Sequence, residues 1–162
     1  MKTEARIKKL KEIWKLGNIS SAKPITEVEI SLFQNKKNVL LPSDLVEYFK
    51  TLNGSNDEYD DNFFKLYSLE EFKTVSEELA DFTGVPNYSN IINTLDTPDK
   101  CFVFSDYQFH FFSYAIRLYS NISEENEVYI ICGDEYQVIA KSFSEFLELY
   151  INNSQKLYFE NK

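Results

Sequence analysis

The sequence has little of what interrupts or cross-links a chain: four glycines, four prolines, two cysteines and one histidine among 162 residues. This scarcity of glycine and proline excludes a collagen-like or low-complexity chain. Because there is no CxxC pair and no cluster of cysteine with histidine, a structural zinc site has no ligand set. Cys101 and Cys132 lie in separate apolar segments, either as two buried free thiols or facing each other on neighbouring strands.

Long apolar runs are missing too. The longest ones, such as Val128 to Cys132, are far shorter than the roughly 18 residues that a membrane span requires. Residues 1–6 carry mixed charges and open no continuous apolar region. We therefore expect no secretory signal and no membrane span, and the cytoplasm as the location.

Residues suited to catalysis are sparse as well. His110 is the only histidine and stands among phenylalanines, and nothing in the spacing predicts that it meets Cys101 beside oxyanion donors. A glycine-rich phosphate loop, a GxSxG elbow and an HExxH motif are all absent. The acidic residues of 57–61 lack the spacing and the glycine of an EF-hand. The sequence thus predicts neither an enzyme nor a cofactor or metal site.

The residues that are abundant describe one acidic globular domain. Hydrophobic residues make up 43% of the chain and aromatic residues 16%, enough for a sizeable core. The net charge is 17 − 26 = −9, which argues against a binder of duplex DNA. Residues 1–16 are the exception, with six Lys or Arg against two Glu, so the remainder carries 11 − 24 = −13. This basic helix either packs on its own domain or reaches for an acidic partner.

Apolar periodicity and capping signals predict most of the helices. A capping box, in which a Ser or Thr stands three residues before Glu, occurs at Thr26, Ser68 and Ser142. Pro42 fits the first position of a helix that Asn53-Gly54 ends. The helices are expected over 4–16, 27–33, 42–53, 68–82 and 142–150, with a short turn at 90–95. Residues from 152 on are expected to fray.

Aromatic and β-branched segments predict the strands. They cover 63–67, 101–104, 109–118, 127–132 and 136–140, and Gly133-Asp134-Glu135 is typical of a tight hairpin. Helices gather early in the chain and strands later, with short connections between the strands. The sequence therefore predicts an α+β fold, a mostly antiparallel sheet of about five strands with helices packed around it.

Four segments, taken in this order, resemble the SMI1/KNR4 family of the SUKH superfamily over about 26–150. They are Leu41-Pro42 with Asn53-Gly54, the strand and acidic stretch 64–72, the aromatic segment 102–107, and the closing segment 138–147. The chain departs from many members after Asp106, where Tyr107 to His110 replaces a glycine-bearing segment. The predicted domain organisation is a basic N-terminal helix and linker packed on the domain (1–24), an SMI1/KNR4-like (SUKH) domain (25–152) and a C-terminal tail (153–162).

The resemblance implies an interaction module rather than a catalyst. Bacterial members of the superfamily are widely immunity proteins that bind and block a toxin domain, often a nuclease, whereas fungal members are regulatory scaffolds. We therefore expect an immunity protein that neutralises a cognate toxin domain, with a non-catalytic intracellular scaffold as the alternative. The expected partner is a protein, not a nucleic acid or a membrane.

An acidic surface with interleaved tyrosines suits such a partner. Complementary charge accelerates encounter with a basic groove, and tyrosine rings are common interface anchors. The segments with this composition lie in the expected loop 55–62, in an expected turn after the strand 101–104, and in two later connections. The predicted partner-binding residues are Asp57, Glu58, Tyr59, Asp60, Asp61, Asp106, Tyr107, Glu124, Glu125, Glu127, Asp134, Glu135 and Tyr136.

Overall fold

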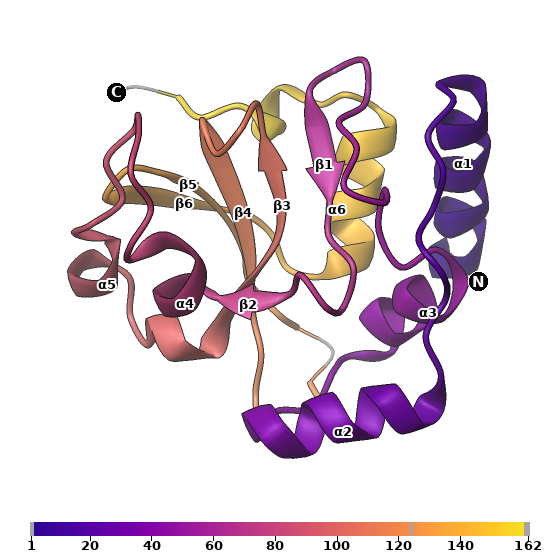
Figure 1. Ribbon diagram of the computed structural model, residues 1–162, viewed down its shortest axis with the longest axis horizontal. Helices are drawn as coiled ribbons and strands as arrows, with labels where there is room; N and C mark the ends of the chain where they lie inside the picture. The colour runs from indigo at the N-terminus through magenta and orange to yellow at the C-terminus, as the bar shows by residue number, and fades with distance from the viewer. Residues whose placement is uncertain (1, 124, 161–162) are drawn as a thin grey trace.

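The computed structural model describes residues 2–123 and 125–160, in which one antiparallel sheet is covered by helices (Figure 1). The strand order is β1-β3-β4-β5-β6, and β2 pairs with β3 beside β1. The strands are β1 (Phe64–Leu66), β2 (Lys73–Thr74), β3 (Cys101–Tyr107), β4 (Phe112–Arg117), β5 (Val128–Cys132) and β6 (Glu135–Ala140). The predicted α+β class is confirmed, and the short β2 is the strand that the sequence did not indicate.

Helices flank the sheet on both faces. They are α1 (Lys2–Leu16), α2 (Glu27–Lys37), α3 (Ser43–Thr51), α4 (Val75–Leu79), α5 (Ile91–Thr94) and α6 (Phe143–Ile151), with 3-10 turns η1 (Pro98–Lys100) and η2 (Gln155–Leu157). All but one of the predicted helices are confirmed, with boundaries shifted by a few residues. The predicted second helix is longer than expected, because α2 continues to Lys37 before Asn38 takes a left-handed φ of 55°.

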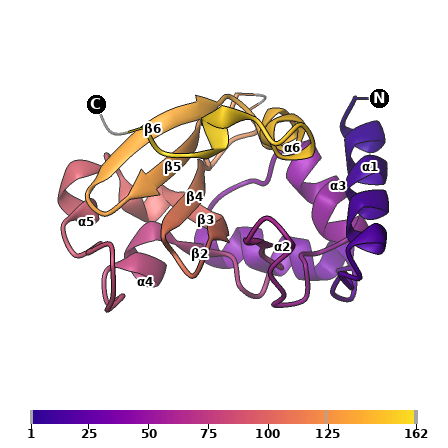
Figure 2. The same ribbon diagram turned by 90° about the horizontal axis from the view of Figure 1, so that it is seen from above.

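One face of the sheet carries the larger core, which we call the larger face. Alternate side chains such as Phe104, Tyr114 and Ile130 point to this face and pack under α1, α3 and α6. Figure 2 shows these three helices grouped together, away from α4 and α5. The basic helix α1 lies on α6, burying Leu10 and Trp14.

The opposite, smaller face is covered by α4 and α5. The intervening side chains Val103, Ala115 and Ile131 point to it and pack against Val75 and Ile91. Both sides of the central strands are thus buried. This double burial explains why the strands read as continuous apolar runs instead of alternating cleanly.

The predicted helix over 68–82 is wrong. Ser68 and Glu71 do bond as expected, Ser68 N donating to Glu71 Oε1 at 3.0 Å, but they close only a turn before β2. A second capping box, with Thr74 as its first residue, then starts α4. Phe72 packs in the larger core and Val75 in the smaller one. A continuous helix would put both on one side, so the chain breaks to cross the edge of the sheet.

The boundaries of the third and fourth strands also differ from the prediction. β3 runs on to Tyr107, and β4 begins at Phe112 instead of 109. Gln108, Phe109 and His110 have φ values of 50°, 54° and 66° and form the turn between the two strands. A strand cannot continue through three left-handed residues, because strand backbone requires negative φ.

The expected fraying of the C-terminal residues is wrong for residues 155–158. Leu157 is fully buried, and the buried hydroxyl of Tyr114 donates to its carbonyl oxygen. The Tyr158 ring lies 5.5 Å from that of Tyr107. A buried tyrosine hydroxyl needs an acceptor, and this segment supplies it.

Asn53-Gly54 ends α3 as predicted and also fixes the next segment. Asn53 Nδ2 donates to Lys23 O, and Leu69 N donates to Asn53 Oδ1, both at 2.8 Å. Gly54 has a φ of 91°, and a Cβ there would lie 2.6 Å from Ser68 N. Only glycine allows this close approach, which places the following acidic loop beside β1.

Candidate protein-binding surface

Most of the predicted partner-binding residues lie at one end of the sheet. Tyr107 pairs with both Phe64 and Phe112, and Cys132 pairs with Glu135. The loop before β1, the β3–β4 turn and the β5–β6 hairpin therefore share this end, which we call the turn end.

The predicted residues of the β4–β5 connection lie at the opposite end. Arg117 N donates to Glu127 O at 2.9 Å, which ties this connection to the end of β4 farthest from the β3–β4 turn. The Glu127 carboxylate accepts from the Tyr119 hydroxyl and lies 3.4 Å from Arg117. Glu125 is exposed nearby, and Glu124 lies outside the described residues. A single surface through all the predicted residues is therefore wrong.

The acidic loop folds around its own side chains. Asp60 Oδ1 accepts from the backbone N–H of Asn62 at 2.8 Å and of Phe64 at 3.0 Å, and Asp60 Oδ2 accepts from the Tyr150 hydroxyl. Asp60 thus holds the loop against α6. Glu58 and Asp61 are exposed and form no ion pair with any residue the structure describes. These two carboxylates are available to a partner, as is that of Asp57, whose side chain is 80% exposed although it pairs with Lys65.

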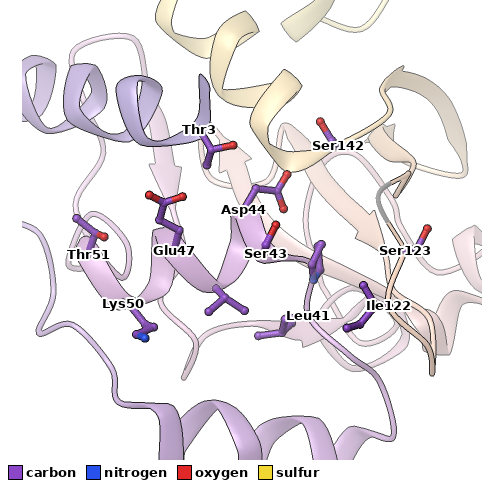
Figure 3. Close-up of a pocket in the computed structure, with 12 residues that line it drawn as sticks. Thr3, Leu41, Ser43, Asp44, Glu47, Lys50, Thr51, Ile122, Ser123 and Ser142 are labelled. Atoms are coloured by element: carbon purple, nitrogen blue, oxygen red, sulfur yellow. The ribbon is translucent and has the colours of Figure 1, made fainter. Parts of the chain in front are cut away.

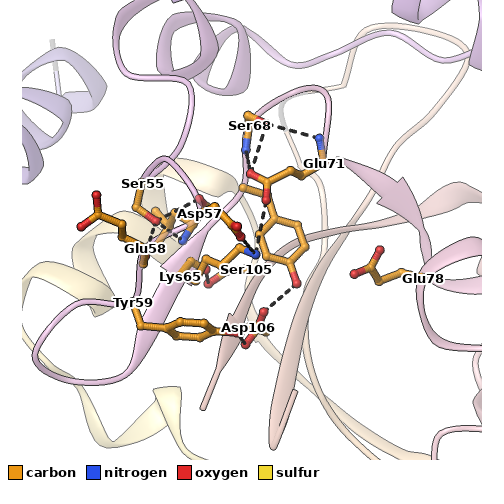
Figure 4. A network of polar contacts seen from close by, with 12 residues as sticks. Ser55, Asp57, Glu58, Tyr59, Lys65, Ser68, Glu71, Glu78, Ser105 and Asp106 are labelled. Carbon is orange, nitrogen blue, oxygen red and sulfur yellow. Dashed lines mark hydrogen bonds and ion pairs between the residues drawn. The ribbon is translucent and has the colours of Figure 1, made fainter. Parts of the chain in front are cut away.

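Lys65 neutralises part of the acidic cluster from inside (Figure 4). Its Nζ pairs with Asp57 and lies 3.3 Å from Glu71 Oε2, over the rings of Tyr59 and Tyr67. The hydrogen bond from Lys65 lowers the pKa of Asp57. Partial burial opposes the charge of Lys65, but the two carboxylates raise its pKa. Lys65 therefore offsets the charge of Asp57 and Glu71, whereas Glu58 and Asp61 keep their outward negative charge.

Asp106 is an internal brace. Its carboxylate is 1% exposed and accepts from the Tyr59 and Tyr67 hydroxyls at 2.7 Å each and from His110 N at 3.1 Å. Burial and the carboxylate together raise the pKa of both tyrosines. The predicted turn at Asp106 and Tyr107 is wrong, because both residues belong to β3. A carboxylate enclosed in this way is not open to a partner.

The hairpin residues are exposed at the turn end. Asp134, Glu135 and Tyr136 all lie on the surface, and the Asp134 carbonyl accepts from Thr94 Oγ1 at 2.7 Å. The Tyr88 hydroxyl connects the hairpin with the β3–β4 turn, donating to His110 O at 2.6 Å and lying 3.4 Å from Ile131 O. The hairpin and the acidic loop therefore flank the turn.

His110 lies in a chain of polar groups that resembles a hydrolytic triad. Its Nε2 is 3.3 Å from Glu78 Oε1, and its Nδ1 is 2.9 Å from Ser113 Oγ. Ser113 is fully buried and bonds onward to Tyr88, so a substrate cannot reach its hydroxyl. The chain instead fixes the β3–β4 turn against α4.

The two cysteines are free and lie at opposite ends of the sheet, so the expectation that they might face each other is wrong. Cys101 pairs with Arg117 and Cys132 with Glu135. Burial raises the pKa of the Cys101 thiol to about 12, which makes it a poor nucleophile. This register also separates Cys101 from His110. In the described part of the chain, no three His, Cys, Asp or Glu side chains gather as a metal site.

A groove of about 820 Å³ runs between α3 and the segment of Ile122 and Ser123 (Figure 3). Asp44 is the most buried acid along it. Its carboxylate accepts from Ser144 N at 2.9 Å and Leu45 N at 2.8 Å, and burial raises its pKa. The carboxylate therefore joins the N-termini of α3 and α6 and has a structural role.

The fold and these motifs agree with a comparison to known families. The sequence profile of the SMI1 / KNR4 family (SUKH-1) matches residues 24–149. The chain belongs to this family. No curated protein matches the sequence significantly.

The SUKH-1 match begins after α1 and ends within α6. Among the residues that the structure describes, no helix is both long and apolar enough to cross a bilayer. The helix α1 lies outside the match, yet its Arg6 bonds to the Ser144 carbonyl at 3.0 Å and pairs with Glu148. This SUKH-1 domain is therefore extended by a helix that packs on its larger face.

Sequence reasoning missed three exposed phenylalanines at the turn end. Phe63, Phe109 and Phe111 were expected in strands, but all three flank strands in turns and are exposed. One signal could have identified Phe109 and Phe111. The stretch 109–112 is Phe-His-Phe-Phe, which has no period-two pattern and so fits a strand poorly.

Proposed function

We propose that this SUKH-1 protein is an immunity protein, which binds a cognate toxin domain, a nuclease, and blocks it without any chemical reaction. The supporting observation is the acidic loop at the turn end. Its own side chains hold it in place, while Glu58 and Asp61 face outward. Asp134 and Glu135 add exposed negative charge at the same end of the sheet.

Charge gives the physical rationale. A nuclease needs cationic side chains to hold phosphates. A fixed anionic surface attracts the same cationic groove and occludes it. Such complementarity raises the association rate and selects the partner more than it sets the final affinity. Prior fixation of the loop lowers the entropy lost on binding.

The direct test is co-expression with the C-terminal domain encoded by the gene immediately upstream. We expect cells to survive only when this protein is present, and the two chains to purify as a stable complex. Cell death without protection, together with no complex, would exclude immunity and leave the regulatory scaffold as the function to pursue.

The role of the acidic loop is tested by neutralising its outward charges. Glu58→Gln with Asp61→Asn should slow association with that toxin domain several-fold at low salt and flatten its salt dependence. Glu125→Gln, at the opposite end of the sheet, is the matched control and should associate at the wild-type rate. Equal rates for both variants would remove the loop from the interface.

A further inference from the structure

Four aromatic side chains lie in the loop before β1 and in the β3–β4 turn, both at the turn end, and we call them the aromatic patch: Tyr59, Phe63, Phe109 and Phe111. The three phenylalanines are 53%, 72% and 44% exposed, respectively. The Tyr59 ring lies 4.6 Å from that of Phe109. Gln108 N donates to Phe63 O at 2.8 Å and so joins the β1 entry to the β3–β4 turn. Large aromatic side chains gathered in the solvent typically mark an interaction site.

The backbone under the patch is strained. Phe63 has a φ of 70° and Phe109 a φ of 54°, a region that bulky residues avoid and glycine tolerates. Packing in the core does not impose these conformations, because both rings face solvent. Strain of this kind persists where the surroundings enforce it, and it clusters at functional sites.

Buried polar groups enforce the strained conformation. Asp106 accepts from His110 N and from the hydroxyl of Tyr59, the partner of Phe109 in the patch. The Tyr88 hydroxyl donates to His110 O at 2.6 Å. His110, the residue after Phe109, is thus fixed from below through both its N–H and its carbonyl group. A surface held in one conformation loses little freedom when it binds.

The charges around the patch define the partner. Glu58 and Asp61 are exposed in the loop that carries Tyr59 and Phe63, while Lys65 is held inside by Asp57. The patch is therefore an apolar centre with an anionic rim. An apolar centre with an anionic rim is complementary to an apolar pocket surrounded by lysine and arginine side chains. The arginine guanidinium groups can also stack on the aromatic rings.

We propose that the aromatic patch is the anchor of the interface, filling an apolar pocket beside the cationic site of the toxin domain. This inference rests on the proposed function and names its contact residues. The phenylalanines supply the slow dissociation of the complex, and the surrounding acids supply its fast association.

Glycine substitution separates binding from folding. Phe109→Gly removes the ring and relieves the positive φ, so its melting temperature should equal or exceed that of the wild type. Its dissociation constant for the upstream-encoded toxin domain should rise at least about tenfold, mainly through faster dissociation. Phe63→Gly should behave alike. Ile122→Ala truncates a 75% exposed side chain at the opposite end of the sheet and should bind within about twofold of wild type.

Three results would overturn the proposal. If the glycine variants bind like the wild type, the patch is not the anchor, although immunity stands. If they unfold at a clearly lower temperature, the phenylalanines are structural. If the wild-type protein and every variant all fail to bind, the proposed function fails together with this inference. Hydrogen exchange adds a readout without mutation: amides 108–111 should become more protected in the complex.

Discussion

The two faces of the sheet are stabilised by different kinds of interaction. The larger face is an apolar interior of phenylalanine and leucine under three helices, with rings such as Phe104 and Phe146 at 4.7 Å in edge contact. The smaller face has only two short helices over it, and its core ends in polar groups: Asp106, Ser113 and Tyr88. Non-directional apolar packing holds the first face, and directional hydrogen bonds order the end of the second.

This difference between the faces shows that the stability of the fold and the conformation of the surface turn have separate physical origins. Burial of large rings stabilises the fold but does not dictate the conformation of a surface turn. A buried carboxylate with three donors does, because each donor must lie at hydrogen-bond distance. The aromatic patch belongs to the end of the smaller face, where this ordering is found.

The largest expected effect comes from truncating the larger face. Phe146 is fully buried, so Phe146→Ala should lower the free energy of unfolding by about 3–5 kcal/mol. Urea denaturation followed by circular dichroism measures this. A loss below about 1 kcal/mol would show that this core can collapse around the cavity and would weaken the contrast between the faces.

The second largest loss of stability is expected when the buried polar groups at the end of the smaller face are disrupted. Asp106→Ala leaves the Tyr67 hydroxyl and the His110 N–H without their acceptor and should cost about 1–3 kcal/mol. It should also speed amide exchange in the turn 108–111. Tyr67→Phe is the control, because it removes one donor but keeps the brace on the turn. If Asp106→Ala leaves exchange in the turn unchanged, the ordering role is wrong.

A matched pair of helix caps compares the faces directly. Thr74 caps α4 on the smaller face and Ser142 caps α6 on the larger one, each accepting from the backbone N–H three residues on. Thr74→Ala and Ser142→Ala should each cost about 1 kcal/mol. Native-state hydrogen exchange should show local opening of α4 in the first variant, and only global unfolding in the second. Identical exchange patterns would mean that the two faces open together.

The smallest effect is expected from the exposed loop. The lowered pKa of Asp57 means that its pair with Lys65 stabilises the fold above the unfolded pKa of the aspartate. This contribution is lost as the pH falls through the lowered value. Asp57→Asn should cost at most about 0.5 kcal/mol at neutral pH and low salt, and nothing at high salt. Urea melts at two salt concentrations check this; a salt-independent loss would contradict it.

Capping and periodicity predicted an element correctly where all its apolar side chains pack into the same core. The helix after Ser142 and the β5–β6 hairpin formed as predicted, because cap, turn and apolar pattern agree there. The segment after Ser68 failed although its capping box forms. Its apolar residues divide between two cores, and periodicity alone carries no information on which core a residue joins.

For the candidate surface, too, the sequence predicted some features and missed others. Acidic loops with tyrosine were recognisable from composition, but composition could not separate Glu127, at the far end of the sheet, from Asp134. Nor could it show that Asp106 faces inward. Phe109 was hidden because aromatic residues usually indicate strands. The turn at that position depends on the inward orientation of the Asp106 carboxylate and on Tyr88, which is remote in sequence and comes close only when the sheet forms.

The sequence by itself determined the class of fold and the excess of negative charge, because periodicity and capping act over a few residues and charge is a matter of composition, and the order of its motifs carried the resemblance to the family. Tertiary structure decided which charges share a surface, which carboxylates are enclosed and which rings remain in water. Those outcomes depend on strand register and on hydrogen bonds between distant segments, which exist only once the chain has folded.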